Sequence, residues 1–480
     1  MTTTHRTETD SLGDVAVPAH AYYGVHTARA QQNFAVTGTT IGELPAMVAS
    51  IAAVKQAAAL TNAELGLLDQ ARASAITQAC REIQDGALHD QFVVDPIQGG
   101  AGTSTNMNAN EVIANRALEI LGHDRGRYDE VDPLMHVNMG QSTNDVYPTA
   151  MKLCAVAGLR QLVVSLEALA DSFRAKSAEF ADVVKMGRTQ LQDAVPMTLG
   201  QEFATYAVML VEDCERLREG TSLLLESNLG GTAIGTGING HPEYSAKACS
   251  HLSRLVGEDV VPAGDLIEAT QDCGSFVQVS GILKRVAVKL SKTCNDLRLT
   301  SSGPCAGLGE INLPPVQAGS SIMPGKVNPV IPEMVNQVAF EVIGNDVTIT
   351  MAAEAGQLQL NAFEPIIAYS LLRSIQHLTA AADTLATRCI DGITANREHL
   401  EDTVARSVGT VTALTPFIGY ANSARIAKQA LATGDRVPDL VVAQGLLTVE
   451  QVQQLLDPHR LAALQATTPG AAILEPPIVP

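Results

Sequence analysis

The chain has 480 residues, of which 46% are hydrophobic and 17% charged, a composition typical of folded proteins and outside the disordered range. Its 32 basic and 51 acidic side chains give a formal net charge of −19, which disfavours nucleic acid and anionic membrane surfaces as partners. The length exceeds that of one compact core and predicts roughly two to four domains. Aromatic residues make up only 4% and tryptophan is absent, which favours close-packed helices over sheet sandwiches.

The eight cysteines include no Cys-x-x-Cys pair. Such spacing supports neither a zinc site nor a disulfide framework, and it predicts buried thiols in a reducing compartment. Residues 1–14 are polar and lack the apolar segment of a signal peptide. Because no run of about 18 uninterrupted apolar residues occurs either, we expect no membrane span and a cytoplasmic protein.

Residues 1–148 are predicted to form an N-terminal domain of mixed, mostly helical structure. Helices are expected at 44–65 and 69–84, and a further helix after Thr105. The glycine-rich residues 99–102 form a flexible loop that leads into this last helix. Free backbone N–H groups at such a helix start suit an anion.

Residues 149–401 are predicted to form a central domain of long amphipathic helices. Apolar residues recur there at three- and four-residue spacing. Five helices are expected, around 159–173, 198–225, 276–297, 333–360 and 364–389. Because their apolar faces exceed what one chain can cover, we expect a helix bundle and an oligomer. Residues 402–480 are predicted to form a small C-terminal helical domain.

The segment 319–333 reads Gly-Ser-Ser-Ile-Met-Pro-Gly-Lys-Val-Asn-Pro-Val-Ile-Pro-Glu. Its prolines and glycines predict a loop. Ser320, Lys326 and Asn328 supply a possible base, a cation and an amide donor, which are the groups needed to bind and deprotonate a carboxylic acid. Taken alone, the same composition also fits a polar surface turn.

Three further polar segments lie outside the apolar periodicity, at 102–108, 136–145 and 185–196. Each concentrates hydroxyl and amide groups, which are neutral hydrogen-bonding groups suited to a substrate with several carboxylates. Each also directly precedes a long helix or its approach. A helix bundle could therefore bring several of them together at one end.

Two competing signals are weaker. Residues 235–240 match the Gly-x-Gly-x-x-Gly dinucleotide pattern, but no βαβ unit surrounds them and Pro242 interrupts the exit. His26, His136 and His251 lack the paired spacing of metal ligands, so a structural role is favoured for each.

The residues at 319–333 resemble the signature loop of the aspartase/fumarase superfamily, and those around Ser142 and Thr189 resemble its other two shared regions. From residues 22–27 to 416–419 the chain is similar to the aspartase branch nearly throughout. The resemblance implies a mainly α, three-domain fold and a homotetramer. Its centre would be a twenty-helix bundle with five helices from each chain. Each active site would be shared by three subunits.

The resemblance also implies the reaction, a reversible anti elimination of ammonia from L-aspartate to give fumarate through an aci-carboxylate intermediate. Ser320 would be the general base, ionised by oriented backbone N–H groups and by the charge of Lys326. Lys326 and Asn328 would hold the α-carboxylate. The remaining substrate-binding residues implied are Thr103, Ser142, Thr143, Asn144, Thr189 and Gln190, with Asn144 and Thr189 also contacting the amino group. No cofactor is required; a divalent cation such as magnesium could activate the enzyme at a site that the sequence does not locate.

Gln190 stands where similar fumarases place a histidine that helps to activate water. Glutamine cannot accept a proton near neutral pH, which argues against fumarate hydration and for ammonia chemistry. Some aspartases keep the histidine. A glutamine at this position therefore argues against a fumarase, whereas a histidine would not argue against an aspartase. Fumarate hydratase remains the alternative enzyme, and a catalytically inactive structural homologue is the non-enzymatic alternative.

Overall fold

The computed structural model describes residues 5–457, and these divide into two compact units. Unit 1 holds the chain up to Val164 together with Asp213–Val288 and Val338–Thr379. Unit 2 holds Ser165–Glu212, Lys289–Gln337 and the chain from Ala380 onward. The division into three domains at 148 and 401 stays a prediction.

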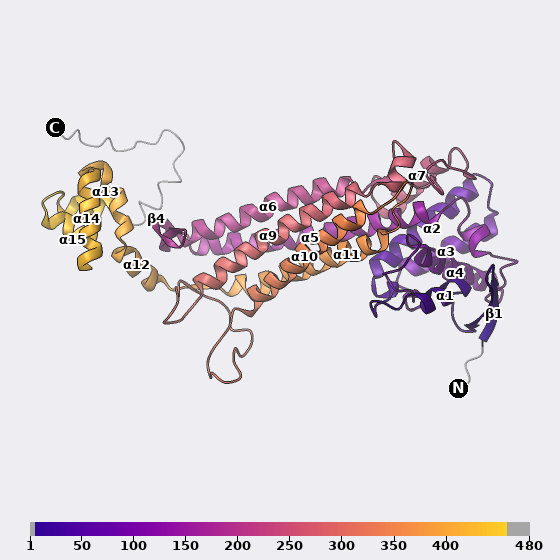
Figure 1. Ribbon diagram of the computed structural model, residues 1–480, viewed down its shortest axis with the longest axis horizontal. Helices are drawn as coiled ribbons and strands as arrows, with labels where there is room; N and C mark the ends of the chain where they lie inside the picture. The colour runs from indigo at the N-terminus through magenta and orange to yellow at the C-terminus, as the bar shows by residue number, and fades with distance from the viewer. Residues whose placement is uncertain (1–4, 458–480) are drawn as a thin grey trace. The chain divides into compact units, whose positions relative to one another are not determined.

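Unit 1 gathers the N-terminal helices around the alanine-rich helix α2 (Figure 1). Proline at the first position of α2 starts the helix without losing a hydrogen bond, and its many alanines allow neighbours to approach closely from all sides. The bounds are α1 Val25–Asn33, α2 Pro45–Glu64, α3 Gln70–Gln84, α4 Thr103–Ile120, α7 Tyr244–Val256 and α8 Leu266–Gln271. Helix α2 packs against α3 and α7, and α4 packs against α3. The predicted helices at 44–65 and 69–84 are confirmed, and the third begins at Thr103.

Short strands complete this unit. An antiparallel hairpin pairs β1 (His5–Asp10) with β2 (Gly13–Pro18). A parallel pair joins β5 (Glu226–Ser227) to β6 (Val261–Pro262).

The short helical turns of the two units are η1 Ile41–Glu43, η2 His89–Gln91, η3 Pro133–Val137, η4 Ile390–Gly392 and η5 Val408–Thr410.

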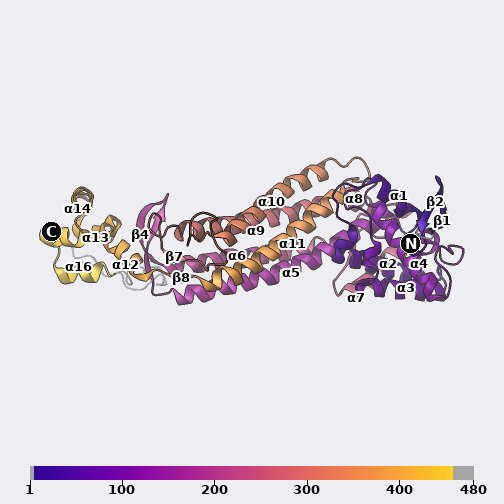
Figure 2. The same ribbon diagram turned by 90° about the horizontal axis from the view of Figure 1, so that it is seen from below.

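Five long helices supply segments to both units, and in each unit these segments run side by side (Figures 1 and 2). They are α5 Thr143–Glu179, α6 Leu199–Ser222, α9 Gly274–Thr300, α10 Val330–Glu354 and α11 Glu364–Arg388. The apolar positions that predicted them are buried, including Leu159, Leu162, Leu166, Phe173, Phe276, Val279, Leu283 and Val286. The mainly α fold with five long helices per chain is confirmed.

Helix α5 is long and apolar enough to cross a membrane by length and composition alone. Its most apolar window has a mean hydropathy of 1.6. However, 61% of that window is buried inside the protein, as in the core helix of a folded domain. The burial of this helix accounts for its apolar composition, and the expectation of no membrane span stays a prediction.

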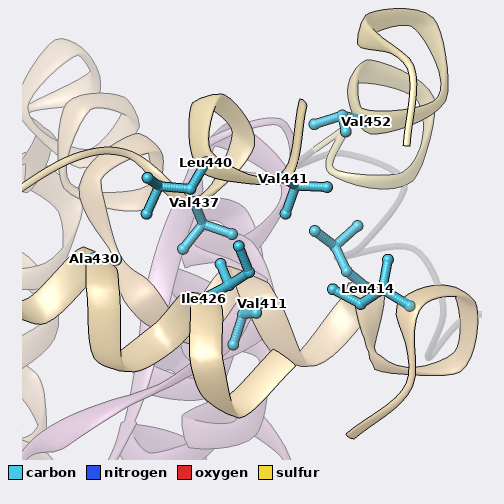
Figure 3. Packing of buried hydrophobic residues seen from close by; sticks show 9 residues of the cluster. Val411, Leu414, Ile426, Ala430, Val437, Leu440, Val441 and Val452 are labelled. Carbon is cyan, nitrogen blue, oxygen red and sulfur yellow. The ribbon is translucent and has the colours of Figure 1, made fainter. Parts of the chain in front are cut away.

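In unit 2, an antiparallel hairpin pairs β3 (Val184–Thr189) with β4 (Gln192–Thr198), and β7 (Ile311–Asn312) pairs with β8 (Thr394–Ala395). The C-terminal helices are α12 Arg397–Arg406, α13 Val411–Ile418, α14 Tyr420–Thr433, α15 Val437–Ala443 and α16 Val449–Leu455. Helix α12 packs against β3. Residues from α13 to α16, among them Leu414, Ile426 and Val441, form a hydrophobic cluster of their own (Figure 3). Helix α12 runs across the predicted boundary at 401, so a separate C-terminal domain at 402–480 stays a prediction. Residues 458–480 lie outside the described residues.

Two expectations need correction. The segment 319–333 is not a loop throughout, because α10 begins at Val330. Pro332 is tolerated there since the first turn of a helix leaves its N–H groups unbonded in any case. The cysteines are all free thiols, but Cys305 is exposed and only the other seven are buried.

Candidate active site

In unit 1, the start of α5 carries three of the predicted binding residues. Ser142 precedes the helix, and its backbone N–H donates to the carboxylate of Asp145 at 3.0 Å. The other oxygen of Asp145 accepts the backbone N–H groups of Gly230 and Thr232 at 3.1 and 2.9 Å. Burial raises the pKa of Asp145 to about 6 although these bonds oppose the shift. Asp145 thus fixes the turn that presents Ser142, Thr143 and Asn144.

A cluster of amides backs this turn. We call Lys55, Asn106, Asn110, Asn138 and Gln141 the amide cluster. The Oδ1 atom of Asn138 accepts from Lys55 Nζ at 2.9 Å, from Asn110 at 3.1 Å and from Asn106 at 3.2 Å. Asn106 also donates to the hydroxyl oxygen of Thr143 at 3.1 Å. The predicted residue Thr143 is therefore held by a side chain that the sequence did not single out for a role.

Thr103 lies at the start of α4, one turn before Asn106. The preceding Gly102 has a φ of 90°, and a Cβ atom there would lie 2.4 Å from the ring of Tyr147. Only glycine fits this position. Thr103 is exposed, and its hydroxyl donates to the carbonyl of Gly100 at 2.6 Å. In this structure the hydroxyl closes the loop 100–103, and its oxygen can still accept a hydrogen bond.

Asn144 is also engaged within unit 1. Its side-chain amide donates to the carbonyl of Ala233 at 2.7 Å, and its backbone carbonyl accepts from Asn228. The glycines at 235–240 belong to the same region. A Cβ atom at Gly235 would lie 2.4 Å from the backbone of Ile267, so close packing accounts for this glycine.

In unit 2, Thr189 and Gln190 lie at the exposed tip of the β3–β4 hairpin, where Thr189 pairs with Gln192. The two turn residues, Gln190 and Leu191, have φ values of 54° and 61°. Two-residue hairpins of this kind favour asparagine and glycine, and each bulkier residue in the left-handed region costs of order 1–3 kcal/mol. A predicted binding residue thus sits in a strained turn.

Buried charges anchor this hairpin. Glu310 accepts from Lys185 at 2.6 Å with one oxygen and from Arg188 with the other. Lys185 also contacts Glu202 at 2.6 Å. Arg188 directly precedes Thr189, so the network holds the strand that presents the binding residue. The only sequence signal for this network was that Lys185 and Arg188 lie in a polar segment. No sequence feature pointed to Glu310.

The loop before α10 orients the predicted base. The hydroxyl oxygen of Ser320 accepts the backbone N–H groups of Ile322 at 3.2 Å and Met323 at 2.9 Å. Gly319 donates its N–H to the carbonyl of Lys326 at 2.9 Å, which closes the loop. A Cβ atom at Gly319 would lie 2.2 Å from that carbonyl oxygen, so glycine is needed for this close approach.

A cavity of about 420 Å³ in unit 2 is lined by both Lys326 and Asn328. Arg298, Asn312 and Asn396 line the same cavity, so two cations and three amides border it. Asn328 also donates to the carbonyl of Gly319 at 2.5 Å, which ties the cavity to the serine loop. This combination of charges suits an anion such as a carboxylate. Arg298 was missed because in the sequence it is one of several charges along a long helix.

The structure therefore brings the predicted residues into two groups. Thr103, Ser142, Thr143 and Asn144 belong to unit 1, whereas Thr189, Gln190, Ser320, Lys326 and Asn328 belong to unit 2. Within residues 5–457, no group of three or more histidine, cysteine, aspartate or glutamate side chains is placed to hold a metal ion.

Comparison with known proteins defines the class. A family described as Lyase matches residues 13–344, and the family of fumarase C C-termini matches residues 411–463. The chain therefore belongs to the lyase family of the aspartase/fumarase superfamily, which confirms the resemblance found in the sequence.

Individual relatives narrow this class. The chain is 58% identical to an aspartate ammonia-lyase of Pseudomonas aeruginosa, over 95% of this chain and 97% of that protein. It is 53% identical to the aspartate ammonia-lyase of Escherichia coli K12, over 96% of this chain and 97% of that protein.

Solved structures give the same class. A fumarate lyase:delta crystallin from Brucella melitensis bound to cobalt has a TM-score of 0.94 at 55% identity, covering 96% of this chain and all of that one. A class II fumarase from Schistosoma mansoni has a TM-score of 0.91 at 36% identity, covering 96% of this chain and 99% of that one.

Proposed function

We propose that the protein is a carbon–nitrogen lyase that catalyses the reversible anti elimination of ammonia from L-aspartate to give fumarate. The observation that carries this proposal is the near-complete similarity to aspartate ammonia-lyases, at 53–58% identity over at least 95% of the chain. The geometry of the serine loop agrees with the chemistry.

Ser320 is the base in this proposal. The proton to be removed lies next to the β-carboxylate and is weakly acidic. Because a neutral serine hydroxyl is a very poor base, Ser320 must act as the alkoxide. Two backbone N–H groups at the hydroxyl oxygen of Ser320 stabilise that negative charge, in the manner of an oxyanion hole. Lys326, on the same loop, adds a positive charge.

The two carboxylates of the substrate require different partners. Lys326 and Asn328 border the cationic cavity of unit 2 and would hold the α-carboxylate. The hydroxyl groups of Thr103, Ser142, Thr143 and Thr189 would surround the β-carboxylate, where negative charge accumulates in the intermediate. Asn144 and Thr189 would contact the departing amino group, and Gln190 would complete the binding surface.

Fumarate hydration is the second candidate, favoured by the structural similarity to a class II fumarase. Gln190 argues against it, because an amide cannot take a proton from water at neutral pH. An inactive structural homologue is the third candidate. A similar solved structure is described as a fumarate lyase:delta crystallin, which agrees with this candidate.

We also propose a cytoplasmic homotetramer whose active sites combine residues of three subunits. Exposed apolar side chains along α10, namely Phe340, Val347 and Met351, recur at helical spacing and would be covered by other copies of the chain. The net charge of −19 disfavours nucleic acid and anionic membranes as partners. No cofactor is required in this proposal, although a divalent cation such as magnesium could raise activity, and the cobalt complex of a relative supports that option.

The test follows fumarate absorbance with L-aspartate and, separately, with L-malate. We expect fumarate from L-aspartate and little from L-malate. Turnover of L-malate alone would establish a hydratase, and turnover of neither would establish the inactive homologue. A Ser320→Ala preparation purified in the same way controls for contaminating enzymes of the expression host.

A further inference from the structure

Lys55 on α2 is a buried cation whose hydrogen-bond partners are uncharged. Its side chain is 0% exposed, and its ammonium donates to the amide oxygens of Asn138 and Gln141, both at 2.9 Å. Lys185, which is 2% exposed, contrasts with it because two carboxylates contact its ammonium, both at 2.6 Å. The two lysines are equally buried, but only Lys185 has its charge neutralised by contact.

Burying a charge without a contacting counter-ion is unfavourable, because the charge loses its hydration and gains no ion pair in return. Asp145 is the acid that acts most strongly on Lys55 through space. Its oxygens already accept three backbone N–H groups, from Ser142, Gly230 and Thr232. Asp145 therefore binds the backbone at the start of α5 rather than Lys55. The ammonium of Lys55 can accordingly act on a different anion.

The directions of the hydrogen bonds show how Lys55 orients the hydroxyl of Thr143. Asn138 Oδ1 accepts from both Lys55 and Asn106, so Lys55 fixes the amide oxygen that orients Asn106. The same amide nitrogen of Asn106 donates to the hydroxyl oxygen of Thr143. Because an oxygen that accepts this bond keeps its own hydrogen free, Thr143 is set to donate away from the cluster.

We infer that Lys55 is a positioning residue. It holds Asn138, and through Asn138 it orients Asn106, so that Thr143 donates to the β-carboxylate, and its charge offsets the extra negative charge of the aci-carboxylate. This inference rests on the proposed function and deepens it. The charge acts on the intermediate more than on the substrate, because the intermediate carries one more negative charge. Such differential stabilisation accelerates the reaction rather than tightening ground-state binding.

The charge state of Lys55 depends on its surroundings. Burial lowers the pKa of Lys55 to about 7, and Asp145 on α5 and the Cys80 thiol on α3 oppose that shift. The facing parts of α4 and of residues 138–141 contribute uncharged amides, and Tyr244 on α7 contributes a buried phenol near Asp145. A bound dianion stabilises the protonated form of Lys55, so the alkaline limb of kcat/KM is expected to report Lys55.

The test uses Lys55→Met and Lys55→Gln, the second of which keeps a polar group facing Asn138. The matched control is Thr61→Val, which removes a buried hydroxyl of the same helix that bonds only to the carbonyl of Ala57. The probes are succinate, which mimics the substrate carboxylates, and 3-nitropropionate, whose planar nitronate mimics the aci-carboxylate.

Both Lys55 variants should lose about 100-fold in kcat/KM for L-aspartate and about 100-fold in nitronate affinity, while succinate affinity stays within about threefold. The alkaline limb of kcat/KM should also disappear or move. Thr61→Val should behave as wild type in all three measurements. Circular dichroism and the oligomeric state establish that each variant folds.

The inference is overturned if a folded Lys55 variant keeps the wild-type preference for nitronate over succinate. It is also overturned if both affinities fall equally, since that is the effect of a distorted site. Failure of the proposed function is a different result, because the wild-type protein would then form no fumarate from L-aspartate.

Discussion

The carboxylate of Glu310 accepts a hydrogen bond from the ammonium of Lys185 at 2.6 Å, and the two side chains are 1% and 2% exposed, respectively. The same carboxylate forms an ion pair with Arg188, the residue before Thr189. A loop residue thus fixes, through buried charge, the hairpin that presents a predicted binding residue. The strained turn at 190 and 191 is tolerated because this anchor holds the strand below it.

Replacing Glu310 by glutamine should destabilise the protein. The change leaves Arg188 and Lys185 with one carboxylate fewer, and removing one partner of a buried pair costs about 3–5 kcal/mol. We expect a lower midpoint of urea unfolding and a fall in kcat/KM, since Thr189 loses its fixed position. The control is Lys292→Met, whose pair with Asp296 is 60% and 31% exposed, and which should change stability by less than about 1 kcal/mol. Equal effects of the two variants would contradict the assignment.

Replacing Ser320 by alanine should abolish most activity without unfolding the protein. The hydroxyl of Ser320 lies in a loop outside the core, and general-base catalysis contributes about 10²- to 10⁴-fold in rate. The loss should therefore appear in kcat of fumarate formation, while the thermal midpoint stays near that of wild type. Ser321→Ala, at the exposed neighbouring position, is the control and should remain active. A fully active Ser320→Ala variant would place the base elsewhere.

Replacing Gly102 by alanine should distort the start of α4. The new Cβ atom would lie 2.4 Å from the ring of Tyr147, and the backbone φ of 90° already disfavours any side chain. Gly122 is the matched control, because its φ is 84° but no atom lies within 4 Å of the added Cβ. Gly122→Ala should cost only about 1 kcal/mol in the free energy of unfolding, the price of the left-handed conformation. Gly102→Ala should cost clearly more and also raise KM, as measured by urea unfolding and steady-state kinetics.

Glu364 at the start of α11 should make stability depend on pH. Burial raises the pKa of Glu364 to about 8, and Lys152 opposes that shift. Because the folded-state pKa lies above the ordinary value of 4.5, the folded protein binds more protons than the unfolded chain between pH 4.5 and 8. Stability contributed by this group is therefore lost as the pH rises through that window.

Glu364→Gln should remove this dependence and be more stable than wild type at pH 9, by at most about 5 kcal/mol. The measurement is the free energy of urea unfolding at pH 5, 7 and 9. Glu398→Gln, at an exposed position on α12, should leave the wild-type pH dependence unchanged. A pH profile of Glu364→Gln that parallels wild type would show that Glu364 is already ionised at neutral pH.

The amino-acid sequence by itself determined the long helices, the loop before α10 and the polar segments. These features depend on local rules: apolar residues at three- and four-residue spacing predict a helix, and prolines and glycines predict a break. The serine loop could be assigned a chemistry because Ser320, Lys326 and Asn328 lie within nine residues of one another. The similarity of these motifs to a known superfamily supplied the reaction.

Only the tertiary structure decided which side chains support those motifs. Lys55 meets Asn138 across 83 residues of sequence, and Lys185 meets Glu310 across 125. A lysine in a helical pattern looks like a solvated charge until the packing of other helices buries it. The free energy of a buried charge depends on neighbours that no local pattern encodes, so the roles of Lys55 and Glu310 emerge only once the chain is folded.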